Sequence, residues 1–261
     1  MSAPMGAQAD APESSTVDAA TTAGVTAAVT WPAALWRRAL GELLGTGLLV
    51  AVVVGSGIAA ANLSPDDVGL QLLENSLATA LGLAVLIAVL GPLSGAHFNP
   101  VVTLAGWVLG RRDPAGPRLG DVAAYVAAQL TGGIGGALLA NAMFGEPTAI
   151  ATTDRASGAT LLAEVVATAG LVLVIFGLLR AGRDTLIAPA VGAYIGAAYW
   201  FTSSTSFANP AVTLGRVFSD TFAGIAPGSV PPFVLAQLVG GAVGLGLAVV
   251  LYPVGAARAR R

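Results

Sequence analysis

Two stretches of the chain repeat one pattern. Residues 94–104 read SGAHFNPVVTL and residues 204–214 read STSFANPAVTL. Proline suits the first position of a helix and asparagine suits the cap before it, so short helices are predicted over 100–110 and 210–218. A bilayer span takes about 20 residues, so these are half-helices. Paired half-helices inside a hydrophobic chain indicate a membrane pathway near the bilayer midplane.

The composition is that of a membrane protein. Of 261 residues, 55% are hydrophobic and only 10% are charged, whereas soluble domains carry about 25% charged residues. The chain has no cysteine and a single histidine, His97, which excludes disulfides, zinc–thiolate sites and histidine-rich metal sites. We therefore expect no metal and no cofactor. An enzyme is not expected either, because no nucleophile–base pair is apparent, and a net charge of −2 argues against nucleic acid as a partner.

Six long apolar segments are predicted to cross the bilayer. They lie near residues 39–61, 71–91, 119–141, 159–179, 185–202 and 230–252. The two half-helices fall between the second and third spans and after the fifth. The expected fold class is an all-α membrane protein with six transmembrane helices plus two re-entrant half-helices.

The arginines orient these spans. Ten of the twelve basic residues fall on one side of a six-span arrangement, and they are Arg37, Arg38, Arg111, Arg112, Arg118, Arg180, Arg183, Arg258, Arg260 and Arg261. The positive-inside rule therefore places both termini in the cytoplasm, with the chain in the inner or plasma membrane. Residues 1–30 lack the basic start and apolar core of a secretory signal and are predicted to be a disordered cytoplasmic tail. Residues 258–261 are predicted to be a basic cytoplasmic end.

The two halves of the chain match beyond the Asn-Pro stretches. Glu42 in the first span corresponds to Glu164 in the fourth, and Gln129 in the third corresponds to Gln237 in the sixth. Since each half holds three spans, the second half must insert upside down, as an inverted repeat of about 37–141 and 157–253. Small residues are expected to let neighbouring helices approach closely. They are Gly132, Gly133, Gly135 and Gly136, and Gly240, Gly241, Gly244 and Gly246.

SGAHFNP, the paired Asn-Pro motifs, the two span glutamates and the inverted repeat resemble the aquaporin (major intrinsic protein) family. The resemblance covers about residues 37–253, within a channel domain assigned to 31–257. It implies a homotetramer in the lipid bilayer, with one pore per protomer and passive conduction of water or small neutral solutes. It also implies that Glu42, Glu164, Gln129 and Gln237 are structural braces of the pore loops. A proton relay through the two glutamates is the alternative role, and it would make the chain a coupled secondary transporter with broken helices.

The inverted repeat explains how the motif residues would work. The two half-helices meet end to end, and their positive dipole ends face the membrane centre and repel cations. Exposed carbonyls of the loops before each motif would supply acceptors. The pore motifs are Asn99, Pro100 and Val101, and Asn209, Pro210 and Ala211, whose asparagines would donate to a passing oxygen. Val101 stands where the family usually has alanine, and we expect it to narrow the constriction slightly.

In the family, selectivity lies at four positions counted from the Asn-Pro motifs, toward the outer face. Here these positions are Thr79, Ala197, Ser206 and Val212. None is an aromatic residue, a histidine or an arginine, although arginine is usual at the last. The predicted filter is therefore wide and uncharged. In this it resembles the aquaporins of bacterial arsenic-resistance gene clusters, which implies glycerol-like polyols, arsenite as As(OH)3 and methylated arsenicals as solutes. A mainly water-conducting aquaporin is the alternative.

The assignments of Arg216 and His97 stay open between two roles each. Arg216, four residues beyond Val212, either restores positive charge at the outer vestibule or is a snorkelling interfacial arginine. His97 either gates the cytoplasmic mouth by titration or is a hydrogen-bonded loop histidine. Tyr199, Trp200 and Phe201 are expected to form an aromatic belt at the outer end of the fifth span.

Overall fold

The structure is a computed structural model that describes residues 33–113 and 116–253. The predictions for residues 1–30 and 258–261 lie outside the described residues. The α-helices are α1 (Leu35–Leu63), α2 (Val68–Ser94), α3 (Pro100–Gly110), α4 (Leu119–Phe144), α5 (Gly158–Arg180), α6 (Ile187–Phe201), α7 (Pro210–Gly215) and α8 (Val230–Leu251). The described residues also form three 3-10 turns. The turn η1 (Asp184–Leu186) precedes α6, η2 (Arg216–Phe218) follows α7, and η3 (Pro227–Ser229) precedes α8. The described ranges contain no strand, so the all-α prediction is confirmed.

The predicted spans and half-helices are present at nearly the predicted positions. Within the described residues, five helices are long and apolar enough to cross a membrane, namely α1, α2, α4, α5 and the helix that ends in α8. The predicted fifth span is shorter: α6 has 15 residues and follows directly on the turn η1. The second half-helix, α7, ends at Gly215 and tightens into η2.

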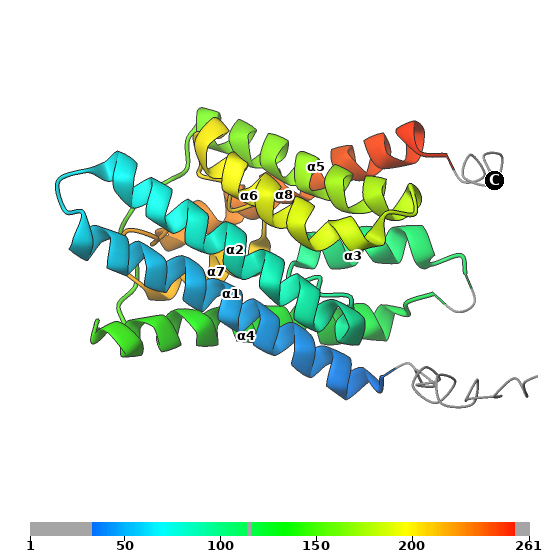
Figure 1. The fold of residues 1–261 in the computed structure, drawn as a ribbon, viewed down its shortest axis with the longest axis horizontal. Helices are drawn as coiled ribbons and strands as arrows, with labels where there is room; N and C mark the ends of the chain where they lie inside the picture. The colour runs from blue at the N-terminus through cyan, green and yellow to red at the C-terminus, as the bar shows by residue number, and fades with distance from the viewer. Residues whose placement is uncertain (1–32, 114–115, 254–261) are drawn as a thin grey trace, which may run out of the picture. The chain divides into compact units, whose positions relative to one another are not determined.

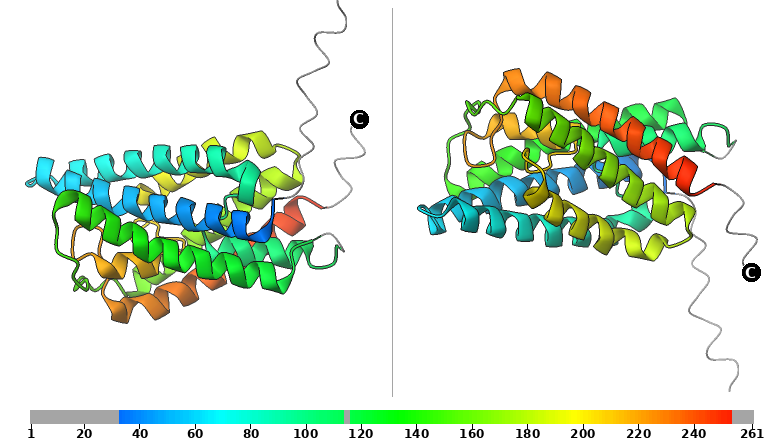
Figure 2. Two further views of the ribbon diagram at one scale, coloured as in Figure 1. Left: turned by 90° about the horizontal axis from the view of Figure 1, so that it is seen from below. Right: turned by 90° about the horizontal axis from the view of Figure 1, so that it is seen from above.

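The helices form two matching halves around the short helices α3 and α7. In the first half α1 packs along α4, in the second α5 packs along α8, and α2 meets α6 between the halves. The start of α1, the end of α8 and the links α3–α4 and α5–α6 lie at one end of the bundle (Figure 1, Figure 2). Among the described residues, this end carries the arginines of the predicted cytoplasmic side.

Glycines allow α1 and α4 to touch backbone to backbone. A Cβ atom at Gly132 would lie 2.3 Å from the Leu43 carbonyl oxygen, and one at Gly136 would lie 2.0 Å from the Gly47 carbonyl oxygen. Neither carbonyl can rotate away, because each belongs to a helix. Any side chain at these two positions must therefore push the helices apart.

The same contact recurs between α5 and α8. A Cβ atom at Gly240 would lie 2.4 Å from the Val165 carbonyl oxygen, and one at Gly244 would lie 2.2 Å from that of Ala169. The prediction for the other small residues is wrong at two positions. Cβ atoms at Gly135 and Gly246 would meet nothing within 4 Å, because these positions face away from the helix contact.

Candidate functional site

The short helices α3 and α7 begin as the sequence predicts, with an asparagine cap and a proline at the helix start. The Asn99 side-chain oxygen accepts the Val101 N–H at 2.9 Å, and the Asn209 oxygen accepts the Ala211 N–H at 2.9 Å. Both asparagines are extended rather than helical in their own backbone, as N-caps are. The predicted caps are confirmed.

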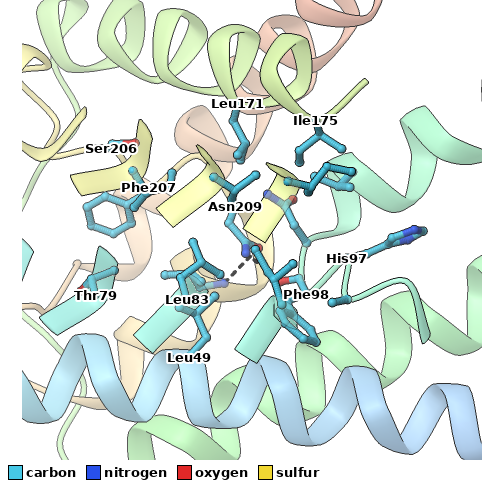
Figure 3. Close-up of a pocket in the computed structure, with 18 of the residues that line it drawn as sticks. Leu49, Thr79, Leu83, His97, Phe98, Leu171, Ile175, Ser206, Phe207 and Asn209 are labelled. Atoms are coloured by element: carbon cyan, nitrogen blue, oxygen red, sulfur yellow. Dashed lines mark hydrogen bonds between the residues drawn. The ribbon is translucent and has the colours of Figure 1, made fainter. Parts of the chain in front are cut away.

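The two caps are also bonded to each other's loops. The Asn99 amide nitrogen donates to the Ala208 carbonyl at 2.7 Å. The Asn209 amide nitrogen donates to the Phe98 carbonyl at 2.7 Å, and both residues are labelled in Figure 3. The starts of α3 and α7 therefore meet, with both positive dipole ends at one place. Each amide nitrogen carries two hydrogens, so one N–H of each asparagine remains for a solute.

The loops before the caps have an unusual backbone. Ala96 and Phe98 have φ values of 47° and 49°, and Ser206 and Ala208 have φ values of 54° and 48°. Non-glycine residues in this left-handed region cost of order 1–3 kcal/mol each and persist only where the surroundings hold them. Thr205, beside Ser206, has a φ of 60° as well. The loops therefore need an external support.

Glu42 supplies that support in the first half. It is fully buried in α1. One carboxylate oxygen accepts the Ser94 hydroxyl at 2.7 Å and the His97 N–H at 3.0 Å. The other accepts the Phe98 N–H at 2.7 Å and the Gln129 amide at 2.8 Å. A carboxylate has acceptor sites for all four donors, so the first loop is held at both ends of its strained segment.

Glu164 makes the equivalent four bonds in the second half. Its oxygens accept the Ser204 hydroxyl at 2.6 Å, the Phe207 N–H at 2.9 Å, the Ala208 N–H at 2.8 Å and the Gln237 amide at 2.7 Å. The carboxylate is again fully buried. These are the contacts expected of a brace. Neither glutamate has an arginine or histidine side chain as a hydrogen-bond partner within the described chain.

The glutamines extend each brace into the half-helix. Gln129 donates to the Thr103 hydroxyl at 2.9 Å, and Gln237 donates to the Thr213 hydroxyl at 2.9 Å. Each threonine in turn donates to the carbonyl of the asparagine cap four residues before it. Loop, half-helix and span are thereby tied into one network in each half.

The expectation for Val101 is wrong. Its side chain is buried against α8, where a Cβ atom at Gly241 would lie 2.3 Å from Val101 Cγ1. It belongs to an apolar cluster with Val172 and Phe176 and is not among the residues that line the central cavity. The two methyl groups that distinguish valine from alanine pack over Gly241, and Val101 does not line the cavity.

This contact predicts a strong coupling between two positions. Gly241→Ala should lower the free energy of unfolding by about 1–3 kcal/mol through overpacking. The same change in a Val101→Ala background should be nearly neutral, because the clashing methyl is gone. A double-mutant cycle on purified protein, followed by thermal unfolding, measures the coupling. Gly246→Ala, at an open position of the same helix, is the control, and additive losses would contradict the assignment.

A cavity of about 230 Å³ runs past the two asparagines. Leu49, Val53, Leu171 and Ile175 give it apolar walls. In Figure 3, His97 lies toward one end, Asn209 lies near the middle, and Thr79, Ser206 and Phe207 lie toward the other. The lining combines long apolar stretches with few polar groups, which is the usual character of small-molecule sites.

Three of the four predicted filter residues line this cavity. They are Thr79, Ser206 and Val212, and all are buried. The fourth prediction is wrong: Ala197 is exposed on α6 and does not line the cavity.

Tyr199 occupies the place expected for Ala197. It is 4% exposed, lines the cavity, and its hydroxyl lies 3.1 Å from the Thr79 hydroxyl. The aromatic-belt prediction is therefore also wrong for this residue, although Trp200 and Phe201 are 52% and 55% exposed as a belt requires. The distance from Asn209 predicted Ala197, but α6 is oriented so that other positions face the cavity. Val191, Ile195 and Tyr199, spaced by four, form its cavity-facing stripe, and that spacing was the available signal.

Arg216 also lines this end of the cavity. It is only 4% exposed and lines the cavity with Val212. Its guanidinium carbon lies 3.5 Å from the centroid of the Phe207 ring, and Nε donates to the Ala223 carbonyl. The interpretation of Arg216 as a snorkelling interfacial arginine is therefore wrong. The prediction of an uncharged filter must be corrected with it.

His97 lies at the opposite end of the cavity. Its Nδ1 is 3.1 Å from the Thr103 hydroxyl, and its ring makes an edge contact with Tyr125 at 5.5 Å between centroids. It is thus a hydrogen-bonded loop histidine that also lines the cavity. No group of three or more metal-ligating side chains is present among the residues described.

Comparison with known proteins agrees with this geometry. The profile of the family described as "Major intrinsic protein" matches residues 29–205. The chain is 50% identical over 214 residues to the aquaglyceroporin AqpS of Rhizobium meliloti, which covers 82% of this chain and 89% of that protein. It is 32% identical to the maize aquaporin NIP2-2, covering 75% of this chain and 66% of the relative. The fold is similar to the X-ray structure of the aquaglyceroporin from Plasmodium falciparum, with a TM-score of 0.63, 23% identity, and coverage of 84% of this chain and 98% of that one.

Proposed function

The chain belongs to the major intrinsic protein family and is a multi-pass membrane channel for small neutral solutes such as glycerol and water, and from this premise we propose that its filter admits polyhydroxylated solutes larger than water. The proposed solutes are glycerol-like polyols, arsenite as As(OH)3 and methylated arsenicals. The observation that carries the proposal is the filter wall. It is formed by Thr79 and Tyr199, whose hydroxyl oxygens lie 3.1 Å apart, together with Ser206 and the methyl groups of Val212.

Each part of that wall suits a different part of such a solute. Hydroxyls both donate and accept hydrogen bonds, so they can replace the water around a solute that carries several hydroxyl groups. Valine at position 212 occupies less space than the arginine usual in the family and leaves room for a carbon or arsenic centre. The resemblance to an aquaglyceroporin over most of its length supports a solute larger than water.

The setting of the channel forms part of the same proposal. We infer that the channel domain of residues 31–257 is a homotetramer in the inner or plasma membrane, with both termini cytoplasmic. The arginines at the end of the bundle that holds the start of α1 and the end of α8 support this orientation. Glu42, Glu164, Gln129 and Gln237 hold the pore loops, and Asn99 and Asn209 donate to the passing solute.

Solute flux into proteoliposomes tests the proposal. Stopped-flow light scattering with water, glycerol and arsenite should show passive flux of all three, without saturation over a wide concentration range. Accumulation against a gradient, driven by protons or sodium, would instead identify a secondary transporter. Flux of water alone would identify a mainly water-conducting aquaporin.

Val212→Arg is expected to make the channel favour water over larger solutes. The added guanidinium and its bulk should lower glycerol and arsenite permeability by about tenfold, a barrier increase near 1.4 kcal/mol, while water permeability falls much less. Val212→Leu, which adds bulk without charge, separates size from charge. Equal losses for water and glycerol, measured by stopped-flow scattering, would show that position 212 does not select.

A further inference from the structure

We propose that Arg216 is the cation of the outer filter, relocated by one helical turn from the position that Val212 occupies, so that this channel excludes cations while keeping a wide aperture. The inference rests on the proposed channel function and names a selecting residue within it. Arg216 would offer N–H donors to the oxygens of a neutral solute, and its charge would repel hydronium and metal cations.

The first support is the position of the side chain. Val212 and Arg216 both line the cavity. Residues four apart on a helix project within about 40° of each other. Arg216 is 4% exposed, and its guanidinium carbon lies 3.5 Å from the centroid of the Phe207 ring, in the loop just before the Asn-Pro motif. It is therefore held in the pore wall.

The second support is the donor count. A guanidinium has five N–H donors. Nε donates to the Ala223 carbonyl, which fixes the plane of the group. The terminal nitrogens make no hydrogen bond to any described residue, and they are not among the fully buried unpartnered atoms. Four donors are thus left at the wall of a cavity that Tyr199 and Ser206 also line.

The third support is an excess of positive charge. Within the described ranges the one salt bridge joins Arg38 to Asp121, far from this site. Glu164 is hydrogen-bonded to four neutral donors and forms no salt bridge with Arg216. A second cation, Arg155, lies 5.6 Å from the same Phe207 ring. Two arginines against one glutamate leave a net positive charge here, which raises the barrier for any cation entering the pore.

Arg155 differs from Arg216 in the way it is used. Its Nε donates to the Gly224 carbonyl at 2.6 Å, and Nη2 donates to the Phe222 carbonyl at 2.9 Å. It does not line the cavity. Arg155 therefore holds the outer loop, which makes it a matched control for the loss of an arginine at this end.

The test removes the positive charge at position 216 and then places one at position 212. Proton influx into proteoliposomes under a potassium diffusion potential, read with an internal pH dye, should rise at least about tenfold in Arg216→Leu. Arg216→Lys should stay proton-tight, because it retains the charge. The double variant Val212→Arg/Arg216→Leu should become proton-tight again and lose glycerol flux, because the guanidinium then stands at the usual position.

Two outcomes would overturn the inference. The first is an Arg216→Leu channel that conducts water normally and leaks no more protons than wild type. The second is an equal leak in Arg155→Leu, which would assign the effect to loop disruption. Failure of the proposed function would look different, since wild-type protein would then conduct neither glycerol nor arsenite.

Discussion

Gly136→Val is expected to prevent α1 and α4 from packing. The new Cβ would lie 2.0 Å from the Gly47 carbonyl oxygen and 3.0 Å from its Cα. Both atoms belong to a helix backbone, so the clash is relieved only by separating the two helices. Overpacking of side chains costs about 1–3 kcal/mol, and a backbone contact cannot relax as a side chain does. We expect the protein to be lost as a monodisperse species in detergent.

The neighbouring glycine provides the control. Gly135→Val makes the same chemical change with the same loss of helix propensity, but its Cβ would meet nothing within 4 Å. It should be recovered normally, with a melting temperature close to that of wild type. Size-exclusion chromatography and thermal unfolding of both variants decide the matter. If the two variants behave alike, the close contact of α1 and α4 does not limit folding.

Glu164→Gln is expected to destabilise the second pore loop. The amide keeps one oxygen and places an N–H₂ group where the other oxygen accepted two donors. Whichever way the amide turns, two buried donors lose their acceptor, at about 1–3 kcal/mol each. The left-handed residues Ser206 and Ala208 would then lack their anchor. We expect a loss of about 2–6 kcal/mol of unfolding free energy and a fall in conduction of every solute.

The repeat makes this prediction sharper. Glu42 makes the same four kinds of bond in the first half, so Glu42→Gln should lower the melting temperature by a similar amount. Asp66→Asn, the same carboxylate-to-amide change at an exposed site, should have no effect. A proton relay between the glutamates predicts another result: the folded Gln variants would keep passive solute flux and lose only proton-coupled transport.

The quasi-symmetry of the chain clarifies what distinguishes this channel. The braces, the cross-bonded asparagines and the glycine contacts recur in both halves with nearly equal distances. The end of the cavity that holds Arg216 breaks the symmetry. There Phe207 stands where the first loop has His97, and Arg216 packs on its ring. We therefore infer that the shared parts build the pore and the asymmetric parts select the solute.

Local patterns were sufficient for much of the fold and for the centre of the pore. The Asn-Pro pairs predicted both half-helices and their caps, because capping depends only on neighbouring residues. The spans followed from hydrophobic length and the inverted repeat from the matched glutamates and glutamines, whose role as braces was implied by the resemblance to the aquaporin family. Each of these signals comes from neighbouring residues or from equivalent positions in the two halves of the chain.

Only the tertiary structure decided which side chains meet at the filter. Ala197 faces outward and Tyr199 faces the cavity because packing against α2 sets the rotation of α6, and residue counting cannot supply that rotation. Val101 points at Gly241 because α8 approaches α3 at that point. Arg216 lines the cavity because it lies at the start of η2 and its guanidinium packs on the Phe207 ring. These outcomes depend on contacts between distant segments, so the sequence alone determined the channel and its centre, and the packing decided the filter.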